Sequence, residues 1–222
     1  IHDTTEYVRQ SLAIWEELGF EFDAISTGFI VTEEETRIIS DFCHRRAQKG
    51  TRVFVDPIMG DNGKLYAGVP ESTIGLMRSL VECADYAVPN YTEACLLTDT
   101  PIAEEITADE ARTLVDAMLA LGTKSVVITS AKVDGASAVI GYDHVAGEYF
   151  EIPFELIPVY FPGTGDTFSA VLMGRVMNGW SLQRATADAM RVVAELIERN
   201  ADQEDKSAGL PIEACLDVID HE

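Results

Sequence analysis

Residues 162–170 read Pro-Gly-Thr-Gly-Asp-Thr-Phe-Ser-Ala and lead directly into an apolar stretch with helical spacing. Gly163 and Gly165 allow the backbone to turn sharply and to bring its N–H groups close to a ligand. Asp166 falls in the first turn of the helix expected over residues 166–178, where unpaired N–H groups attract anions. A carboxylate beside an anion site suits phosphoryl transfer, because it can take the proton of the attacking hydroxyl. The alternative is an aspartate N-cap on a glycine-rich turn.

Polar side chains also follow three predicted strands, at residues 52–56, 85–88 and 125–129. The polar residues at or just beyond these strand ends are Asp56, Asp61, Asn90, Glu93, Thr129 and Ser130. Ligands of parallel α/β sheets bind at the carboxyl ends of strands. The sequence therefore predicts a ligand site at that edge of the sheet. The alternatives are a turn-shaping role for Asp56, a helix cap for Asn90, solvated acids at 61 and 93, and a strand-end turn at 129–130.

Helices and strands alternate along the chain. Helices are expected over residues 4–18, 32–50, 72–83, 107–122, 166–178, from 181 onward and 211–220, with capping boxes at Thr32/Glu35 and Thr107/Glu110. The further strands expected are 22–30 and an antiparallel pair at 136–142 and 147–152. This alternation predicts an α/β fold of three layers, with a mainly parallel sheet and helices on both faces. No repeat or linker interrupts it, so residues 1–222 are expected to form a single domain.

Four segments together resemble the pyridoxal kinases of the ribokinase-like superfamily. They are Asp-Pro-Ile-Met-Gly-Asp at 56–61, Pro-Asn-Tyr-Thr-Glu at 89–93, Val-Ile-Thr-Ser at 127–130 and Gly-Thr-Gly-Asp-Thr-Phe-Ser-Ala at 163–170. They occur in the order and spacing of that family, and the resemblance covers nearly the whole chain. The glycine loop is shared by the superfamily, whereas Asp-Pro-x-x-Gly-Asp is more specific to vitamin kinases. The resemblance implies a ribokinase-like fold and ATP-dependent phosphorylation of the hydroxymethyl group of pyridoxal, pyridoxine or pyridoxamine.

The resemblance also implies roles for the site residues. Asp166 becomes the general base, and the loop residues that supply amides to the phosphoryl group are Gly163, Thr164 and Gly165. Asp61 and Glu93 are expected to orient Mg²⁺ and its waters. The residues expected to contact ATP or its phosphates are Asn90, Thr129, Ser130 and Asp56. The residues expected at the vitamin ring are Thr27, Gly28 and Phe29. Mg-ATP is the implied cofactor, a monovalent cation is a further candidate, and a homodimer is the implied assembly.

The chain departs from the family pattern in three places. Phe29 stands where the family usually has a tyrosine, Val31 replaces a glycine, and Val88 replaces a threonine before Pro-Asn. Members of the family also carry about one further βα portion before the position of Ile1. The kinase domain is therefore expected to lack its N-terminal βα portion, which includes ring-binding residues.

The charge and the cysteines bound the function further. The net charge of −22 argues against a nucleic-acid or anionic-membrane surface. No stretch approaches a membrane span in length. The cysteines, which have no metal-ligand spacing, are expected to be free thiols in a reducing compartment: Cys43, Cys83, Cys95 and Cys215. The expected location is the cytoplasm, and the expected partners are a B6 vitamer and ATP.

Two other classes of function remain open on the sequence. One is a hydroxymethylpyrimidine or sugar kinase of the same superfamily. The pyrimidine kinases often carry a cysteine where this chain has Asp166, and the sugar kinases usually lack the Asp56–Asp61 segment. The other is a catalytically silent nucleotide-binding protein, against which the intact Gly163, Gly165 and Asp166 argue.

Overall fold

The computed structural model describes residues 3–30 and 32–219, and the chain divides into two compact units. The first unit runs to Glu151 and the second begins at Ile152. The predicted departure at Val31 and the end of the helix expected over 211–220 lie outside the described residues.

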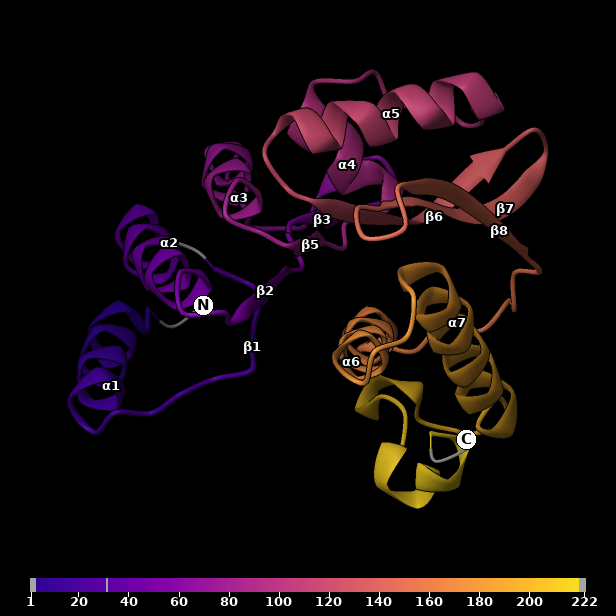
Figure 1. The fold of residues 1–222 in the computed structure, drawn as a ribbon. Coiled ribbons are helices and arrows are strands. Elements are labelled where there is room, and N and C mark those ends of the chain that lie inside the picture. Colours follow the sequence, from indigo (N-terminus) through magenta and orange to yellow (C-terminus); the bar gives the residue numbers. More distant parts are fainter. Residues whose placement is uncertain (1–2, 31, 220–222) are drawn as a thin grey trace. The chain divides into compact units, whose positions relative to one another are not determined.

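A six-stranded sheet in the order β1-β2-β5-β6-β7-β8 forms the centre of the first unit, and β8 runs on into the second (Figure 1). The strands are β1 Ala24–Thr27, β2 Arg52–Val55, β5 Tyr86–Ala87, β6 Ser125–Val133, β7 Ala136–Asp143 and β8 Glu148–Phe154. The first four are parallel, in a register that aligns Thr27 with Val55, Val55 with Ala87, and Ala87 with Val126, and β7 runs antiparallel to β6. The α/β class and the mainly parallel sheet are confirmed.

In the first unit, α2 to α5 contribute buried side chains to the core that they share with the sheet, whereas α1 contacts α2. Figure 1 shows α4 and α5 above β6 and β7. These helices are α1 Thr5–Glu17, α2 Glu33–Ala47, α3 Thr73–Val81, α4 Tyr91–Thr98 and α5 Ala108–Ala120. In α5 the buried side chains recur at helical spacing, at Ala111, Leu114, Val115 and Met118. They pack with Val53, Val55 and Ile128 in one apolar core.

The two predicted capping boxes have different outcomes. At α5 the box is complete, because Thr107 and Glu110 exchange both hydrogen bonds. At α2 only half of it forms. Thr32 accepts from the Glu35 amide at 3.0 Å, but the Glu35 carboxylate turns away and accepts from the Thr4 hydroxyl at 3.0 Å. A hydrogen-bond donor on the neighbouring segment, the Thr4 hydroxyl, therefore takes the place of the Thr32 amide as the partner of the Glu35 carboxylate.

The second unit contains two helices, α6 Thr164–Met177 and α7 Leu182–Arg199, followed by short 3₁₀ turns. Ser181 caps α7 by accepting from the Arg184 amide. Arg175 of α6 and Asp188 of α7 form a half-buried ion pair at 2.7 Å. The prediction of a single helix over 211–220 is wrong for the residues that the structure describes. The chain there makes two separate turns, at Ile212–Ala214 and Leu216–Val218.

None of the helices in the part of the chain that the structure describes has the length and apolar character needed to cross a bilayer.

Candidate active site

The parallel strands of the first unit place their polar ends side by side. Thr27 is the last residue of β1, and its carbonyl accepts from the Asp56 amide at 3.2 Å. Asn90 follows β5 and forms a parallel bridge with Thr129, whose amide donates to the Pro89 carbonyl at 3.0 Å. The structure therefore brings the predicted residues of β1, β2, β5 and β6 to one edge of the sheet, as the strand-end rule requires.

A capping box at the start of α4 joins Asn90 and Glu93. The Asn90 Oδ1 accepts from the Glu93 amide, and the Glu93 Oε2 accepts from the Asn90 amide, both at 2.9 Å. The other carboxylate oxygen of Glu93 accepts from the amides of Met59 at 3.0 Å and Gly60 at 3.4 Å. The Asn90 side-chain amide donates to the Gly60 carbonyl at 2.8 Å. The first turn of α4 thus holds the segment that follows Asp56.

Glu93 lies in a nearly closed environment. Its exposed fraction is 3%, and this burial raises the pKa of its carboxyl to about 7. The amides of Asn90 and Met59 oppose the shift, while the negative charge of Asp56 adds to it. Since backbone amides occupy both carboxylate oxygens, Glu93 has a structural role in clamping the 59–60 segment. Its role toward Mg²⁺ stays a prediction.

Asp61 lies on a small hairpin, which was not among the predicted elements. Strands β3 Gly60–Asp61 and β4 Lys64–Leu65 pair antiparallel, with Asp61 opposite Lys64. Asn62 and Gly63 form the two-residue turn, and both have left-handed φ angles, 51° and 79°. The Asn-Gly dipeptide is the sequence signal for this turn.

Two further contacts fix this hairpin. The Asp61 carboxylate accepts from the backbone and side-chain amides of Asn62, at 2.7 and 3.0 Å. At the tip, the Gly63 amide donates to the hydroxyl of Thr92 at 2.9 Å. Thr92 belongs to the Pro-Asn-x-x-Glu segment but lies at one of its variable positions, so no motif pointed to it.

Thr129 and Ser130 do not end their strand, which corrects the sequence expectation. Strand β6 continues to Val133, and its register with β7 shifts between Ile128 and Ala131. Ser130 has a left-handed φ of 59° within this β-bulge. The parallel pairing to β5 stops at this point while the antiparallel pairing to β7 goes on. The two hydroxyls therefore still lie at the ligand edge, on a bulge and not on a loop.

The three residues predicted at the vitamin ring differ in exposure. Thr27 is buried, and its hydroxyl has no hydrogen-bond partner within the described part of the chain. A buried hydroxyl without a partner is rare in folded proteins, and a hydrogen bond to a bound ligand is one explanation for it. Phe29 is 45% exposed. Gly28 backs onto Ile58, since a Cβ at this position would lie 3.6 Å from the Ile58 Cδ1.

The glycine loop lies in the second unit. Gly163 caps α6 with a left-handed φ of 85°, which favours glycine. The helix begins at Thr164, two residues earlier than predicted, so Gly165 is helical and only Gly163 makes the sharp turn. The first intrahelical bond is that of the Thr167 amide to the Gly163 carbonyl, at 3.0 Å. The preceding amides of the first turn have no intrahelical acceptor, and Asp166 is exposed; their role toward a ligand stays a prediction.

The oxygen donors of the first unit fit Mg²⁺ in the way that nucleotide enzymes use it. No cluster of three metal-ligating side chains exists within residues 3–30 and 32–219. Mg²⁺ is usually bound through one or two carboxylates plus phosphate oxygens and water, without a cage of protein ligands. Asp61 is half-buried and displays its carboxylate on a fixed turn, which suits such a ligand.

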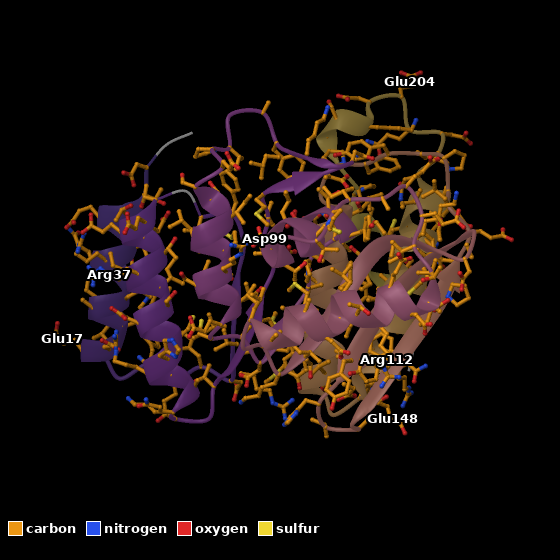
Figure 2. The ribbon with its side chains drawn as sticks, turned by 90° about the horizontal axis from the view of Figure 1, so that it is seen from above. Glu17, Arg37, Asp99, Arg112, Glu148 and Glu204 are labelled. Atoms are coloured by element: carbon orange, nitrogen blue, oxygen red, sulfur yellow. The ribbon has the colours of Figure 1, made fainter. Side chains whose placement is uncertain are left out.

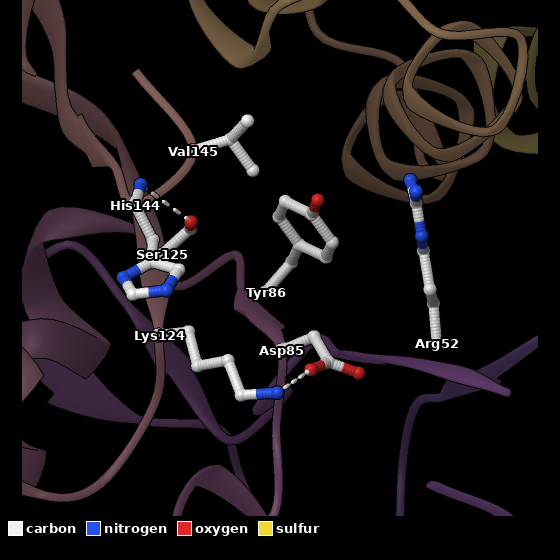
Figure 3. A pocket seen from close by; sticks show the side chains of 7 residues that line it. All are labelled: Arg52, Asp85, Tyr86, Lys124, Ser125, His144 and Val145. Atoms are coloured by element: carbon white, nitrogen blue, oxygen red, sulfur yellow. Dashed lines mark hydrogen bonds and ion pairs between the residues drawn. The ribbon is translucent and has the colours of Figure 1, made fainter. Parts of the chain in front are cut away.

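A cavity of about 230 Å³ lies at the opposite ends of these strands (Figure 3). Its lining residues are Arg52, Asp85, Tyr86, Lys124, Ser125, His144 and Val145. An ion pair of 2.6 Å joins Lys124 to Asp85, and the His144 amide donates to the Ser125 hydroxyl at 3.0 Å. None of the predicted site residues lines this cavity.

The sequence of the chain is similar to those of known pyridoxal kinases. A pyridoxal kinase of Arabidopsis thaliana is 34% identical over an alignment of 174 residues that covers 73% of this chain and 53% of the relative. The human pyridoxal kinase is 28% identical over an alignment of 172 residues that covers 69% of this chain and 54% of the relative. The chain spans about half the length of the curated relatives it matches.

Solved structures show the same fold. A protein assigned as a phosphomethylpyrimidine kinase in Bacteroides thetaiotaomicron, crystallised with pyridoxal, is 31% identical and superimposes with a TM-score of 0.92, covering 99% of this chain and 78% of that one. The pyridoxal kinase of Lactobacillus plantarum is 25% identical with a TM-score of 0.86, covering 98% and 78%. The family model of phosphomethylpyrimidine kinases matches residues 4–210. The chain therefore belongs to the phosphomethylpyrimidine kinase family, within the ribokinase-like superfamily.

Proposed function

We propose that this chain carries the phosphoryl-transfer site of an ATP-dependent kinase that acts on the hydroxymethyl group of pyridoxal, pyridoxine or pyridoxamine. The observation that carries the proposal is the start of α6, where Gly163 turns the chain and Asp166 lies beside amides that have no intrahelical acceptor. The pyridoxal kinases among the relatives support the substrate class.

In the proposed reaction, Asp166 accepts the proton of the vitamer hydroxyl as its oxygen attacks the γ-phosphorus of ATP. One P–O bond forms, the bond to the β-phosphate oxygen breaks, and ADP leaves. The amides at the start of α6 stabilise the charge on the transferring group, a contribution of a few kcal/mol in comparable sites. Mg²⁺, when bound, neutralises phosphate charge, and Asp61 and Glu93 are the residues proposed to hold it and its waters. A monovalent cation is proposed as a further cofactor, and the dependence of the activity on the K⁺ concentration tests it.

The remaining contacts follow from the sheet edge. We assign the polar strand ends to ATP and its phosphates, namely Asp56, Asn90, Thr129 and Ser130. Thr27, Gly28 and Phe29 are assigned to the vitamin ring. The unpartnered hydroxyl of Thr27 offers one hydrogen bond, and the exposed ring of Phe29 offers a stacking face.

We also propose that the two units form one kinase domain, since their boundary falls inside β8. A single unfolding transition is then expected by calorimetry. A homodimer is proposed as well, supported by exposed apolar side chains on α1 at Tyr7 and Ile14 and at Leu18, which caps the end of this helix. Light scattering tests the proposed dimer. A cytoplasmic location fits the four free thiols.

The test is an ATP-turnover assay with pyridoxal, pyridoxine, pyridoxamine, hydroxymethylpyrimidine and ribose at equal concentrations. The highest kcat/KM is expected for a B6 vitamer. The family model favours the pyrimidine as the second candidate, and a higher kcat/KM for it or for ribose would overturn the vitamer assignment. If none of the five compounds led to the release of ADP, the kinase assignment would be overturned.

A further inference from the structure

The first turn of α4 forms hydrogen bonds with both the base and the tip of the β3–β4 hairpin, which carries Asp61. At the base, Glu93 and Asn90 hold Met59 and Gly60 through three hydrogen bonds. At the tip, the Thr92 hydroxyl accepts the Gly63 amide at 2.9 Å. Thr92 is 4% exposed, so its hydroxyl is fixed by packing. The base and the tip are thus held by different side chains, which mutation can separate.

The tip governs the orientation of Asp61. Asn62 and Gly63 form the turn, and each carboxylate oxygen of Asp61 accepts a hydrogen bond from Asn62. A chain of contacts therefore runs from Thr92 through Gly63 and Asn62 to the Asp61 carboxylate. The contacts at the base reach only Met59 and Gly60, at the start of the hairpin, and none of them involves the turn residues Asn62 and Gly63.

We propose that Thr92 is a positioning residue of this site, which holds the Asp61 carboxylate in the orientation that binds Mg²⁺ with the nucleotide. This inference rests on the proposed function and deepens it. Outer contacts that orient a metal ligand typically change metal affinity by 10- to 100-fold. Gly63 is exposed, so water can replace the lost acceptor and the fold tolerates the change.

The informative variants are Thr92→Val, which keeps the shape and removes the acceptor, and Thr92→Ser, which keeps the acceptor. For Thr92→Val we expect the half-saturating Mg²⁺ concentration to rise about tenfold, with the KM for pyridoxal changed less than twofold. Thr92→Ser is expected to stay within twofold of the unmodified protein on both measures. Thr98→Val is the matched control, since Thr98 lies at the far end of α4 and donates to the Ala94 carbonyl at 2.8 Å.

A second readout needs no turnover. Hydrogen exchange of the Gly63 amide in the ligand-free protein should be faster in Thr92→Val and unchanged in Thr92→Ser and Thr98→Val. Calorimetry of Mg²⁺ binding in the presence of ADP should follow the same order.

The outcomes separate the two proposals. Magnesium titrations of Thr92→Val that superimpose on those of the unmodified protein, or a Thr92→Ser variant as impaired as Thr92→Val, would overturn the role of Thr92. A protein that turns over none of the substrates refutes the proposed function alone. In that case the exchange and calorimetry experiments still decide whether Thr92 positions Asp61.

Discussion

At the scale of single residues, Asp166 is the side chain on which the proposed chemistry depends. It lies exposed in the first turn of α6, so replacing it with asparagine removes the proton acceptor and leaves the shape of the turn. Asp166→Asn is expected to lower kcat by about 10²–10⁴-fold while ATP binding is nearly unchanged. Steady-state kinetics and nucleotide titration measure the two quantities.

Asp109 provides the matched control for this variant. It is also an exposed aspartate in the first turn of a helix, α5, but belongs to no predicted site. Asp109→Asn should leave kcat unchanged. If Asp166→Asn retained the kcat of the unmodified protein, Asp166 would have no part in proton transfer.

Glu93 makes a prediction about stability and pH. Its folded-state pKa of about 7 lies above the ordinary value of 4.5, so the folded protein keeps a proton that the unfolded chain releases. The contribution of Glu93 protonation to the free energy of unfolding is therefore greatest below pH 4.5. It decreases by about 3 kcal/mol as the pH rises to and beyond about 7. The free energy of unfolding is measured in urea, without divalent cations, for the unmodified protein and for Glu93→Gln. The difference between the two proteins should fall by about 3 kcal/mol over this pH range.

Glu110 supplies a control of opposite sign. It closes the corresponding capping box of α5 but is exposed, and hydrogen bonds from the Thr107 amide and hydroxyl lower its pKa. Its contribution is present above the ordinary pKa and is lost as pH falls through the folded-state value. The difference between the unmodified protein and Glu110→Gln should therefore shrink on acidification. For Glu93, the contradicting result is a difference in unfolding free energy between the unmodified protein and Glu93→Gln that does not change with pH. It would show that Glu93 does not hold a proton at neutral pH.

At the scale of elements, two glycines differ in how closely their surroundings are packed. In β7, a Cβ on Gly141 would overlap the Val126 carbonyl and lie 2.5 Å from the Phe150 ring, so Gly141→Ala should cost about 1–3 kcal/mol. In α3, a Cβ on Gly75 would meet nothing within 4 Å, and Gly75→Ala should add about 0.5–1 kcal/mol. Urea unfolding measures both. Equal effects of the two substitutions would contradict the packing in β7.

The elements that could be predicted are those with local signals. Thr107, Glu110 and the apolar stripe defined α5 because capping and periodicity act within one helix. The extension of β6 past Thr129 could not be predicted in this way. Its antiparallel pairing to β7 and the bulge at Ser130 depend on a partner strand, which local propensity does not report.

The candidate site shows the same division. The strand-end residues could be placed from the sequence because parallel strands share one edge. The contacts of Glu93 with the Met59 and Gly60 amides, and that of Thr92 with Gly63, connect segments about thirty residues apart, beyond any local pattern. The Asn62-Gly63 hairpin is the exception: the Asn-Gly dipeptide is a local turn signal, so this hairpin could have been predicted from the sequence.

At the scale of the whole molecule, the excess of acidic side chains is the dominant electrostatic feature. The chain has 38 aspartates and glutamates against 16 lysines and arginines. Figure 2 shows charged side chains projecting from the surface, among them Glu17, Glu148 and Glu204. The ion pairs that form are largely exposed, such as Arg37 with Asp41, and pairs of this kind contribute about 0–1 kcal/mol each. We therefore expect the repulsion among the excess acidic side chains to exceed the attraction within these exposed pairs.

Added salt should consequently stabilise the protein. Repulsion among distant surface charges is screened over about 10 Å at 0.1 M ionic strength, whereas a contact pair loses less. We expect Tm to rise by about 2–4 °C for each kcal/mol of repulsion removed as NaCl increases from 10 to 300 mM. Sodium sulfate at matched ionic strength separates screening from preferential exclusion, because only screening makes the two salts coincide. A Tm that fell with NaCl would mean that the exposed ion pairs, and not the net charge of −22, set the electrostatic stability.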